Sequence, residues 1–161
     1  MENGFSYVAR DDARILILGS MPGIKSLEEQ QYYAHPRNAF WPVMGTLLNF
    51  DPAVPYEQRL QALTEKKVAL WDVLAQCERP GSLDSAIVKD SIVVNDFDAF
   101  FTKHPSVQQI FCNGAKSFEL YMRQVGSDAA PVTQLPSTSP ANARMSFEEK
   151  LSAWSVLTDS L

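Results

Sequence analysis

Short, almost wholly apolar runs recur along the chain and are separated by longer amphipathic stretches. The runs are 14–19 (RILILG), 67–74 (KVALWDVL), 107–114 (VQQIFCNG) and, more weakly, 131–136 (PVTQLP). Continuous apolar runs of this length are typical of strands that are buried on both faces of a parallel sheet. The pattern therefore predicts four strands, each leading into a loop.

The stretches between these runs carry apolar residues at helical spacing. One helix face is expected in segment 56–63 and another in segment 97–104, with Asn95 as the N-cap of the second. A further helix should begin near residues 38–40, because Pro42 is tolerated only in a first turn.

The clearest helix signal lies in the last segment of the chain. Ser146 and Glu149 have the spacing of a capping box. The apolar stripe that follows consists of Phe147, Leu151, Trp154, Leu157 and Leu161. We interpret this stripe as part of the core and not as a binding site.

Strands that alternate with helices imply right-handed crossovers and a parallel sheet covered on both sides. The sequence therefore predicts an α/β protein, a three-layer α/β/α sandwich with a central, mainly parallel four-stranded sheet. One domain should span residues 1–161. In such sheets ligands bind beyond the carboxyl ends of the strands, so the loops that follow the four runs should meet at one cleft.

Composition and charge restrict the class of protein to which the chain can belong and the ligands that it can bind. With 45% hydrophobic and 20% charged residues, the chain has the profile of a folded globular protein. It has no apolar run of about 18 residues, so we expect a cytoplasmic protein without membrane contact. The net charge of −5 argues against a broad coat of nucleic acid, so any DNA contact must be local. Cys77 and Cys112 lack the spacing of metal ligands, and we expect neither a metal nor a cofactor.

The segment GSMPG at 19–23 directly follows the first predicted strand. Gly19 and Gly23 permit a tight backbone path that can present N–H groups to an oxygen atom. The segment has neither the lysine of a Walker loop nor the GxGxxG spacing. A plain turn is the alternative.

The segment YYAHPRNAFWPVM at 32–44 concentrates aromatic and polar side chains. Asn38 either caps the following helix or turns its amide into the cleft. On the capping interpretation Phe40 and Trp41 belong to the core. That interpretation does not explain the cluster of side chains with polar tips beside them, namely Tyr32, Tyr33, His35 and Arg37.

The segment LPSTSPAN at 135–142 is a stiff loop rich in small hydroxyl side chains. Such a loop can hold phosphate oxygens, and Arg144 just beyond it adds positive charge. An ordinary surface turn is the alternative. The candidates for DNA binding are Pro136, Ser137, Thr138, Ser139 and Arg144.

The order of these three segments resembles the uracil-DNA glycosylase superfamily over about residues 14–157. The HPxNxFW pattern and the GxxPG turn are similar to the mismatch-specific enzymes. LWDVLAQCERPGSLDSAI and LPSTSPAN are more similar to the hypoxanthine (deoxyinosine) branch. The resemblance implies a uracil-DNA glycosylase-like fold and a DNA glycosylase.

Two positions depart from the family pattern. Met21 stands where the mismatch-specific enzymes have an asparagine that positions water, and Leu135 stands where many relatives have a histidine. The resemblance to the hypoxanthine branch implies that Asn38 is the catalytic residue. The candidates for base binding are Gly19, Ser20, Met21, His35, Phe40 and Asp72, with Phe40 as the stacking platform.

Asp72 lies where relatives read a pyrimidine through a side-chain amide. A carboxyl group there could accept a hydrogen bond from N1–H of hypoxanthine or N3–H of uracil. An ionised carboxylate would repel a departing anionic base. A capping or turn role is the alternative.

We expect a monofunctional, monomeric glycosylase that flips a deaminated base out of double- or single-stranded DNA and hydrolyses its N-glycosidic bond in base excision repair. Hypoxanthine is the preferred base and uracil the second. The alternatives are a uracil/thymine mismatch-specific glycosylase and, because of Met21 and Leu135, a catalytically weak relative that binds nucleic acid. An unrelated α/β hydrolase is disfavoured, because the chain has no G-x-S-x-G motif and only His35 and His104 for a triad.

Overall fold

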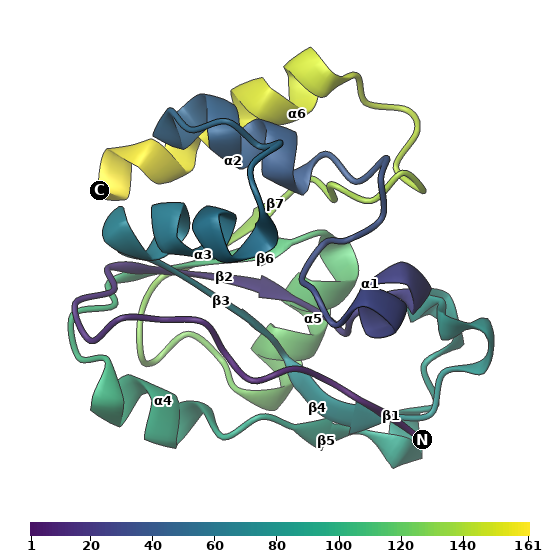
Figure 1. The fold of residues 1–161 in the computed structure, drawn as a ribbon. Coiled ribbons are helices and arrows are strands. Elements are labelled where there is room, and N and C mark those ends of the chain that lie inside the picture. Colours follow the sequence, from purple (N-terminus) through teal and green to yellow (C-terminus); the bar gives the residue numbers. More distant parts are fainter.

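Four parallel strands form the centre of the computed structural model, which describes residues 1–161 (Figure 1). They are β2 (Ile15–Gly19), β3 (Val68–Asp72), β6 (Gln109–Asn113) and β7 (Val132–Leu135). Their order is β3-β2-β6-β7, and every neighbouring pair is parallel. β2 and β3 are buried along their whole length, as strands covered on both faces must be. The predicted parallel four-stranded sheet is confirmed.

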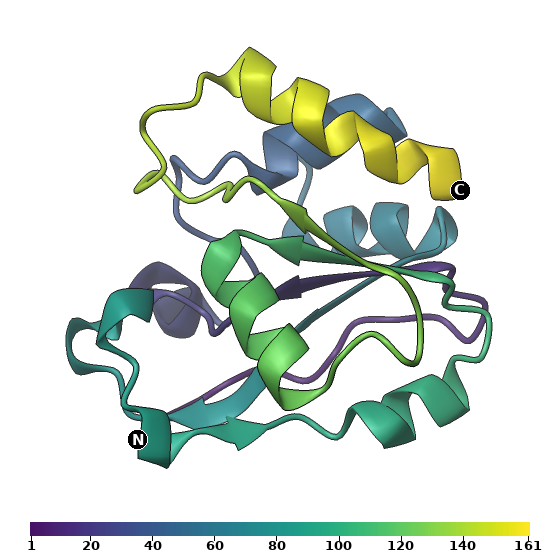
Figure 2. The ribbon, with the colours of Figure 1, turned by 180° about the vertical axis from the view of Figure 1, so that it is seen from behind.

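Helices cover both faces of this sheet (Figures 1 and 2). They are α2 (Phe40–Leu48), α3 (Tyr56–Glu65) and α6 (Phe147–Trp154) on one face, and α4 (Phe97–Lys103) and α5 (Ala115–Gln124) on the other. Ile15 and Ile17 of β2 pack in a core cluster with side chains of the first group, and Leu16 and Leu18 pack in a cluster with the second. Alternate residues of one strand thus pack in the two hydrophobic cores on opposite faces of the sheet, and the three-layer α/β/α sandwich is confirmed.

The apolar run 67–74 was predicted to form one strand, but in the structure it forms parts of two strands. β3 ends at Asp72, and the chain bends at Val73, whose N–H donates to the Gly19 carbonyl oxygen at 2.8 Å. The chain then enters a small antiparallel sheet made of β1 (Glu2–Asn3), β4 (Leu74–Cys77) and β5 (Val93–Val94). The bend is invisible in the hydrophobic pattern, because Val73 and Leu74 are buried like the residues before it.

The N-cap of α4 differs by one residue from the prediction. The Asp96 carboxylate accepts a hydrogen bond from the Ala99 N–H at 3.0 Å, so Asp96 and not Asn95 caps the helix. Asn95 instead donates its side-chain amide to the Asp72 carbonyl oxygen at 2.8 Å. Asn95 therefore stabilises the end of β3.

The predicted capping box of α6 is confirmed. Ser146 Oγ accepts from the Glu149 N–H, and Glu149 Oε1 accepts from the Ser146 N–H. Trp154 and Leu157 are fully buried, with Leu157 in the 3₁₀ segment Ser155–Ser160 that continues the helix. The outer members of the predicted stripe, Phe147 and Leu161, are exposed, so only its middle belongs to the core.

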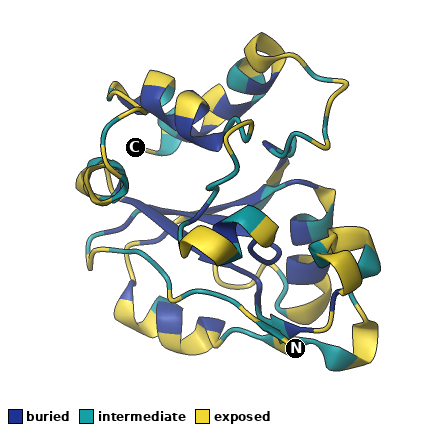
Figure 3. Ribbon diagram, turned by 45° about the vertical axis from the view of Figure 1, so that its right-hand side comes forward, coloured by how far each residue is buried: buried dark blue, intermediate teal, exposed yellow.

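Short helical segments follow the carboxyl ends of β2 and of the β3–β4 stretch. They are the α-helix α1 (Ile24–Glu29) and the 3₁₀ turns η1 (Pro80–Ser82), η2 (Asp84–Ala86) and η3 (Lys89–Ser91). Figure 3 shows that the central strands are buried, whereas these segments carry exposed residues.

None of the helices has the length and apolar character that crossing a membrane requires. No three His, Cys, Asp or Glu side chains are grouped so that they could hold a metal ion.

Candidate active site

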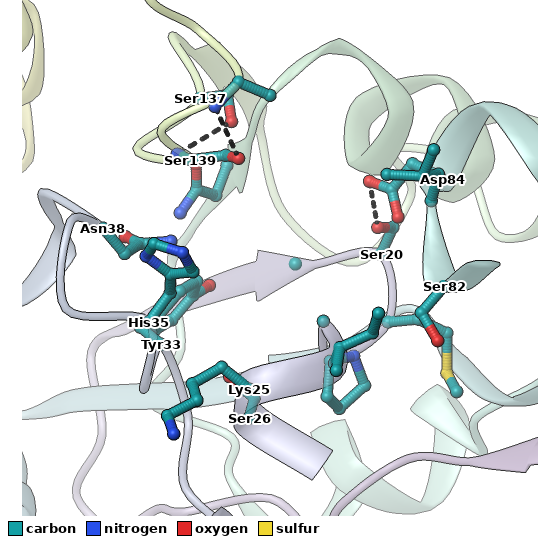
Figure 4. Close-up of a pocket in the computed structure, with 18 of the residues that line it drawn as sticks. Ser20, Lys25, Ser26, Tyr33, His35, Asn38, Ser82, Asp84, Ser137 and Ser139 are labelled. Carbon is teal, nitrogen blue, oxygen red and sulfur yellow. Dashed lines mark hydrogen bonds between the residues drawn. The ribbon is translucent and has the colours of Figure 1, made fainter. Parts of the chain in front are cut away.

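A cavity of about 470 Å³ opens at the carboxyl end of the parallel sheet (Figure 4). Its wall is built by four segments of the chain, 19–26, 32–38, 79–84 and 137–141, together with the ends of β3 and β6. The volume lies in the range of small-molecule sites in proteins. As expected for a parallel sheet, the loops after different strands meet at one cleft.

Most of the predicted site residues line this cavity, although they are far apart in the sequence. Those that line it are Gly19, Ser20, Met21, His35, Asn38, Asp72, Ser137, Thr138 and Ser139. Phe40, Pro136 and Arg144 do not. Arg144 is exposed just beyond the loop, and the Pro136 carbonyl oxygen accepts from the Trp154 indole N–H at 2.8 Å.

Phe40 does not lie where a stacking platform would. Its side chain is fully buried in T-shaped contacts with the rings of Trp41 and Trp154, and it belongs to the core beneath the cavity. The ring of Tyr33 covers it, with ring centroids 4.0 Å apart and planes inclined by 21°. Tyr33 therefore lines the cavity in the place expected of Phe40, and Phe40 supports it from behind.

The HPRN segment is a turn that orients Asn38. The Asn38 N–H donates to the His35 carbonyl oxygen at 2.9 Å, and Asn38 Oδ1 accepts from the Phe40 N–H at 2.9 Å. Ala39, not Asn38, occupies the N-cap position of α2. Both interpretations of Asn38, helix cap and cavity residue, therefore apply. Its Oδ1 accepts from a backbone N–H in the first turn of α2, while its NH₂ group has no partner in the protein. Figure 4 shows Asn38 beside His35 and Tyr33 on one side of the cavity.

The loop 135–142 is held rigidly by side chains from the core. The Asn113 amide donates to Thr138 Oγ1 at 2.9 Å and accepts from the Thr138 N–H at 3.0 Å. Ser137 Oγ accepts from the Ser139 N–H at 3.2 Å. Beneath the loop, the buried Lys150 donates to the Ser139 carbonyl oxygen at 3.4 Å. The hydroxyl groups of Ser137 and Ser139 are therefore presented on a fixed backbone, whereas Thr138 is buried and anchors the loop.

The wall formed by residues 79–84 was not anticipated from the sequence. Arg79, whose side chain is 1% exposed, bridges Glu2 at 2.9 Å and Asp84 at 3.1 Å and donates to the Pro22 carbonyl oxygen. Asp84 in turn accepts from Ser20 Oγ at 2.7 Å. The segment ERPGSLDS has the polar, turn-forming composition of any surface loop, so the only signal for this wall was its resemblance to the family.

Asp72 ends β3 at the inner end of the cavity and is 3% exposed. Burial, together with repulsion from Asp84, raises the pKa of its carboxyl group to about 7, against the opposing attraction of Arg79. Burial also raises the pKa of the nearby Tyr33 hydroxyl, and Asp72 adds to that rise. The cavity therefore holds an acid that is protonated in part at neutral pH.

Comparison with known proteins identifies the family. The model of the "Uracil DNA glycosylase superfamily" matches residues 5–158. The chain belongs to the uracil DNA glycosylase superfamily. The resemblance noted in the sequence is confirmed, and the expected enzyme class, DNA glycosylase, agrees with the family.

Several members of the superfamily are similar over nearly the full chain. A hypoxanthine DNA glycosylase of Methanosarcina barkeri is 36% identical over 156 residues, which is 95% of each chain. A hypoxanthine DNA glycosylase of Methanosarcina acetivorans is 36% identical over 157 residues, 96% of each. The solution NMR structure of a candidate uracil DNA glycosylase from M. acetivorans matches with a TM-score of 0.81 and 35% identity, covering 96% of this chain and 94% of that one.

Proposed function

We propose that this protein is a monofunctional DNA glycosylase that excises hypoxanthine from DNA as a step of base excision repair, with uracil as a second substrate. The observation that carries the proposal is the cavity itself. It joins an aromatic surface, Tyr33, an unpartnered amide, Asn38, and a rigid hydroxyl loop, 137–139, around a volume that accommodates a base. The names of the two Methanosarcina relatives support the choice of hypoxanthine.

A base flipped out of the stack would enter the cavity over Tyr33. Unstacking the base from DNA costs a few kcal/mol, and stacking on an aromatic ring returns about 1 to 3 kcal/mol. The base edge would then point toward Asp72, while the sugar would remain near Asn38 and the hydroxyl loop at the mouth.

Asn38 is the proposed catalytic residue. Hydrolysis passes through an electrophilic, oxocarbenium-like sugar, so the attacking water needs a defined position more than a strong base. Because the Phe40 N–H fixes Asn38 Oδ1, the amide plane cannot rotate freely. The second lone pair of Oδ1 and the free NH₂ group are then available to hold water near C1′.

We also propose that the enzyme has no lyase activity, which would require a lysine that forms a covalent Schiff base with the sugar. Lys25 lines the outer part of the cavity, but its ammonium group pairs with Glu29 at 3.3 Å and Glu28 at 3.8 Å on its own helix. An amine held in two ion pairs is not free to attack the sugar as a nucleophile. Borohydride treatment during turnover should therefore trap no covalent complex between protein and DNA.

The function is tested with oligonucleotides that contain one inosine, uracil or xanthine, each in single- and double-stranded form. Alkali cleaves the strand wherever a base has been released. We expect strand cleavage at inosine in excess over uracil and none in unmodified DNA. Binding without any base release would instead support the alternative of a catalytically weak nucleic-acid-binding protein.

A further inference from the structure

Asp72 is a buried carboxyl group that the protein itself leaves unsatisfied. Oδ2 has no hydrogen-bond partner, and Oδ1 lies so close to Gly19 that a Cβ there would collide with it. The Tyr33 hydroxyl, 3.3 Å from the same Cβ position, is also buried without a partner. Buried polar groups in folded proteins normally have partners, so the unsatisfied carboxyl group of Asp72 at the end of a cavity indicates that a ligand completes it.

Arg79 offsets a negative charge on Asp72 only in part, because burial and the charge of Asp84 raise the pKa of Asp72 by more than Arg79 lowers it. Arg79 donates to Glu2, Asp84 and the Pro22 carbonyl oxygen, so its charge is already balanced by two carboxylates. Asp84 is itself negative and repels an ionised Asp72. In these surroundings Asp72 keeps its proton up to a higher pH than an exposed carboxyl group does, in agreement with the pKa of about 7, and the neutral acid predominates below that pH.

The other titratable groups on the cavity wall do not change this balance. Lys25 is paired with Glu28 and Glu29 on α1. The remaining titratable side chains that line the cavity are Tyr32, Tyr33 and His35. Only Asp84 and Arg79 shift the pKa of Asp72 through their charges, and they act in opposite directions.

A neutral acid at this place has a chemical use. When the glycosidic bond breaks, its electron pair moves onto the base, and a hydrogen-bond donor aimed at the base stabilises that charge. A carboxylate would destabilise it. A deaminated base carries a carbonyl group next to a ring N–H, and a carboxylic acid complements this pair with one donor and one acceptor.

We propose that Asp72 acts on the departing base as a neutral carboxylic acid, donating its O–H to the base carbonyl oxygen and accepting the adjacent ring N–H. The inference rests on the proposed glycosylase function. The C1′–N bond breaks with its electron pair on the base, and a water oxygen forms the new bond to C1′. One water proton ends on the base nitrogen, and Asp72 keeps its own proton throughout.

The test compares the parent with Asp72→Asn, Asp72→Leu and the control Asp128→Asn, which removes the same charge at an exposed site outside the cavity. Asparagine keeps one donor and one acceptor but does not titrate. Release of hypoxanthine is measured as kcat/KM between about pH 5 and about pH 8.5, because this quantity reports the free enzyme. Denaturant unfolding of each protein is measured over the same range.

In the parent and in Asp128→Asn, kcat/KM should be level below about pH 7 and fall about tenfold per pH unit above it. Asp72→Asn should lack this alkaline fall, and Asp72→Leu should be about 10²- to 10³-fold slower at low pH. Because the folded pKa of Asp72 is raised, the parent should lose stability relative to Asp72→Asn as pH rises from about 5 to about 7, and the difference should level off above about pH 7.

An alkaline fall in Asp72→Asn equal to that of the parent, or a stability difference that does not change with pH, overturns the proposal. Failure of the proposed function is a different result, because the parent would then release no hypoxanthine at any pH. The stability measurement does not depend on activity and decides the protonation state of Asp72 in either case.

Discussion

Replacing Tyr33 by alanine removes the aromatic surface that the cavity offers to a flipped base. The ring stacks on Phe40 at 4.0 Å, so it is held in place before the base arrives. Stacking of a base is worth about 1 to 3 kcal/mol, which corresponds to about a 5- to 150-fold loss of kcat/KM for hypoxanthine release. Tyr33→Phe keeps the ring and removes a hydroxyl group without a partner, so we expect its rate to stay within about tenfold of the parent.

Phe40→Ala provides the matched comparison. Its buried ring packs against Trp41 and Trp154, so the substitution should lower the free energy of unfolding by about 3 to 5 kcal/mol. Tyr33→Ala should affect stability less than Phe40→Ala and activity more, measured by denaturant unfolding and by single-turnover release. If Tyr33→Ala folds normally and releases hypoxanthine as fast as the parent, Tyr33 is not the surface on which the base stacks.

Three further predictions concern the cavity and its rim. Asp84→Asn removes the repulsion that raises the pKa of Asp72, so the alkaline fall in kcat/KM should move to lower pH; an unchanged profile would contradict the electrostatic coupling. Gly19→Ala places a methyl group against Asp72 Oδ1, so it should reduce hypoxanthine release by about 10²-fold or more while undamaged DNA binds as before in a fluorescence titration. A plot of log K for DNA binding against log[salt] should have a slope of about −3 to −5. Replacing the exposed Arg37 and Arg144 together by alanine should make this slope shallower by about 2.

The regular elements of the fold were predictable because their signals are local. The apolar runs of the four strands and the Ser146–Glu149 capping box depend only on residues close in sequence. The bend at Val73 was missed because its residues are buried in either arrangement. Asn95 and Asp96 are both good caps, and the choice between them depends on the carbonyl of Asp72, which is distant in sequence.

The site was predictable in part, for the same reason. Asp72 could be placed at the cleft because strand ends meet at one edge of a parallel sheet, whereas the role of Asn38 in the site was implied only by the family resemblance. The sequence could not show that Tyr33 lines the cavity and Phe40 does not. Both residues are aromatic, and only three-dimensional packing decides which one covers the other. The bridge from Arg79 to Glu2 joins residues 77 positions apart, so no local pattern reveals it.

The catalytic role of Asn38 is decided by single-turnover release of hypoxanthine, measured for the parent and for Asn38→Ala. The parent should release the base, and Asn38→Ala should be about 10²- to 10⁴-fold slower while still binding DNA. Loss of the hydrogen bond to the Phe40 N–H should lower the stability of this variant by only about 1 kcal/mol, and Asn38→Asp, which can keep that bond, serves as the stability control. Release by a folded Asn38→Ala at the rate of the parent, or no release by the parent, would contradict the account.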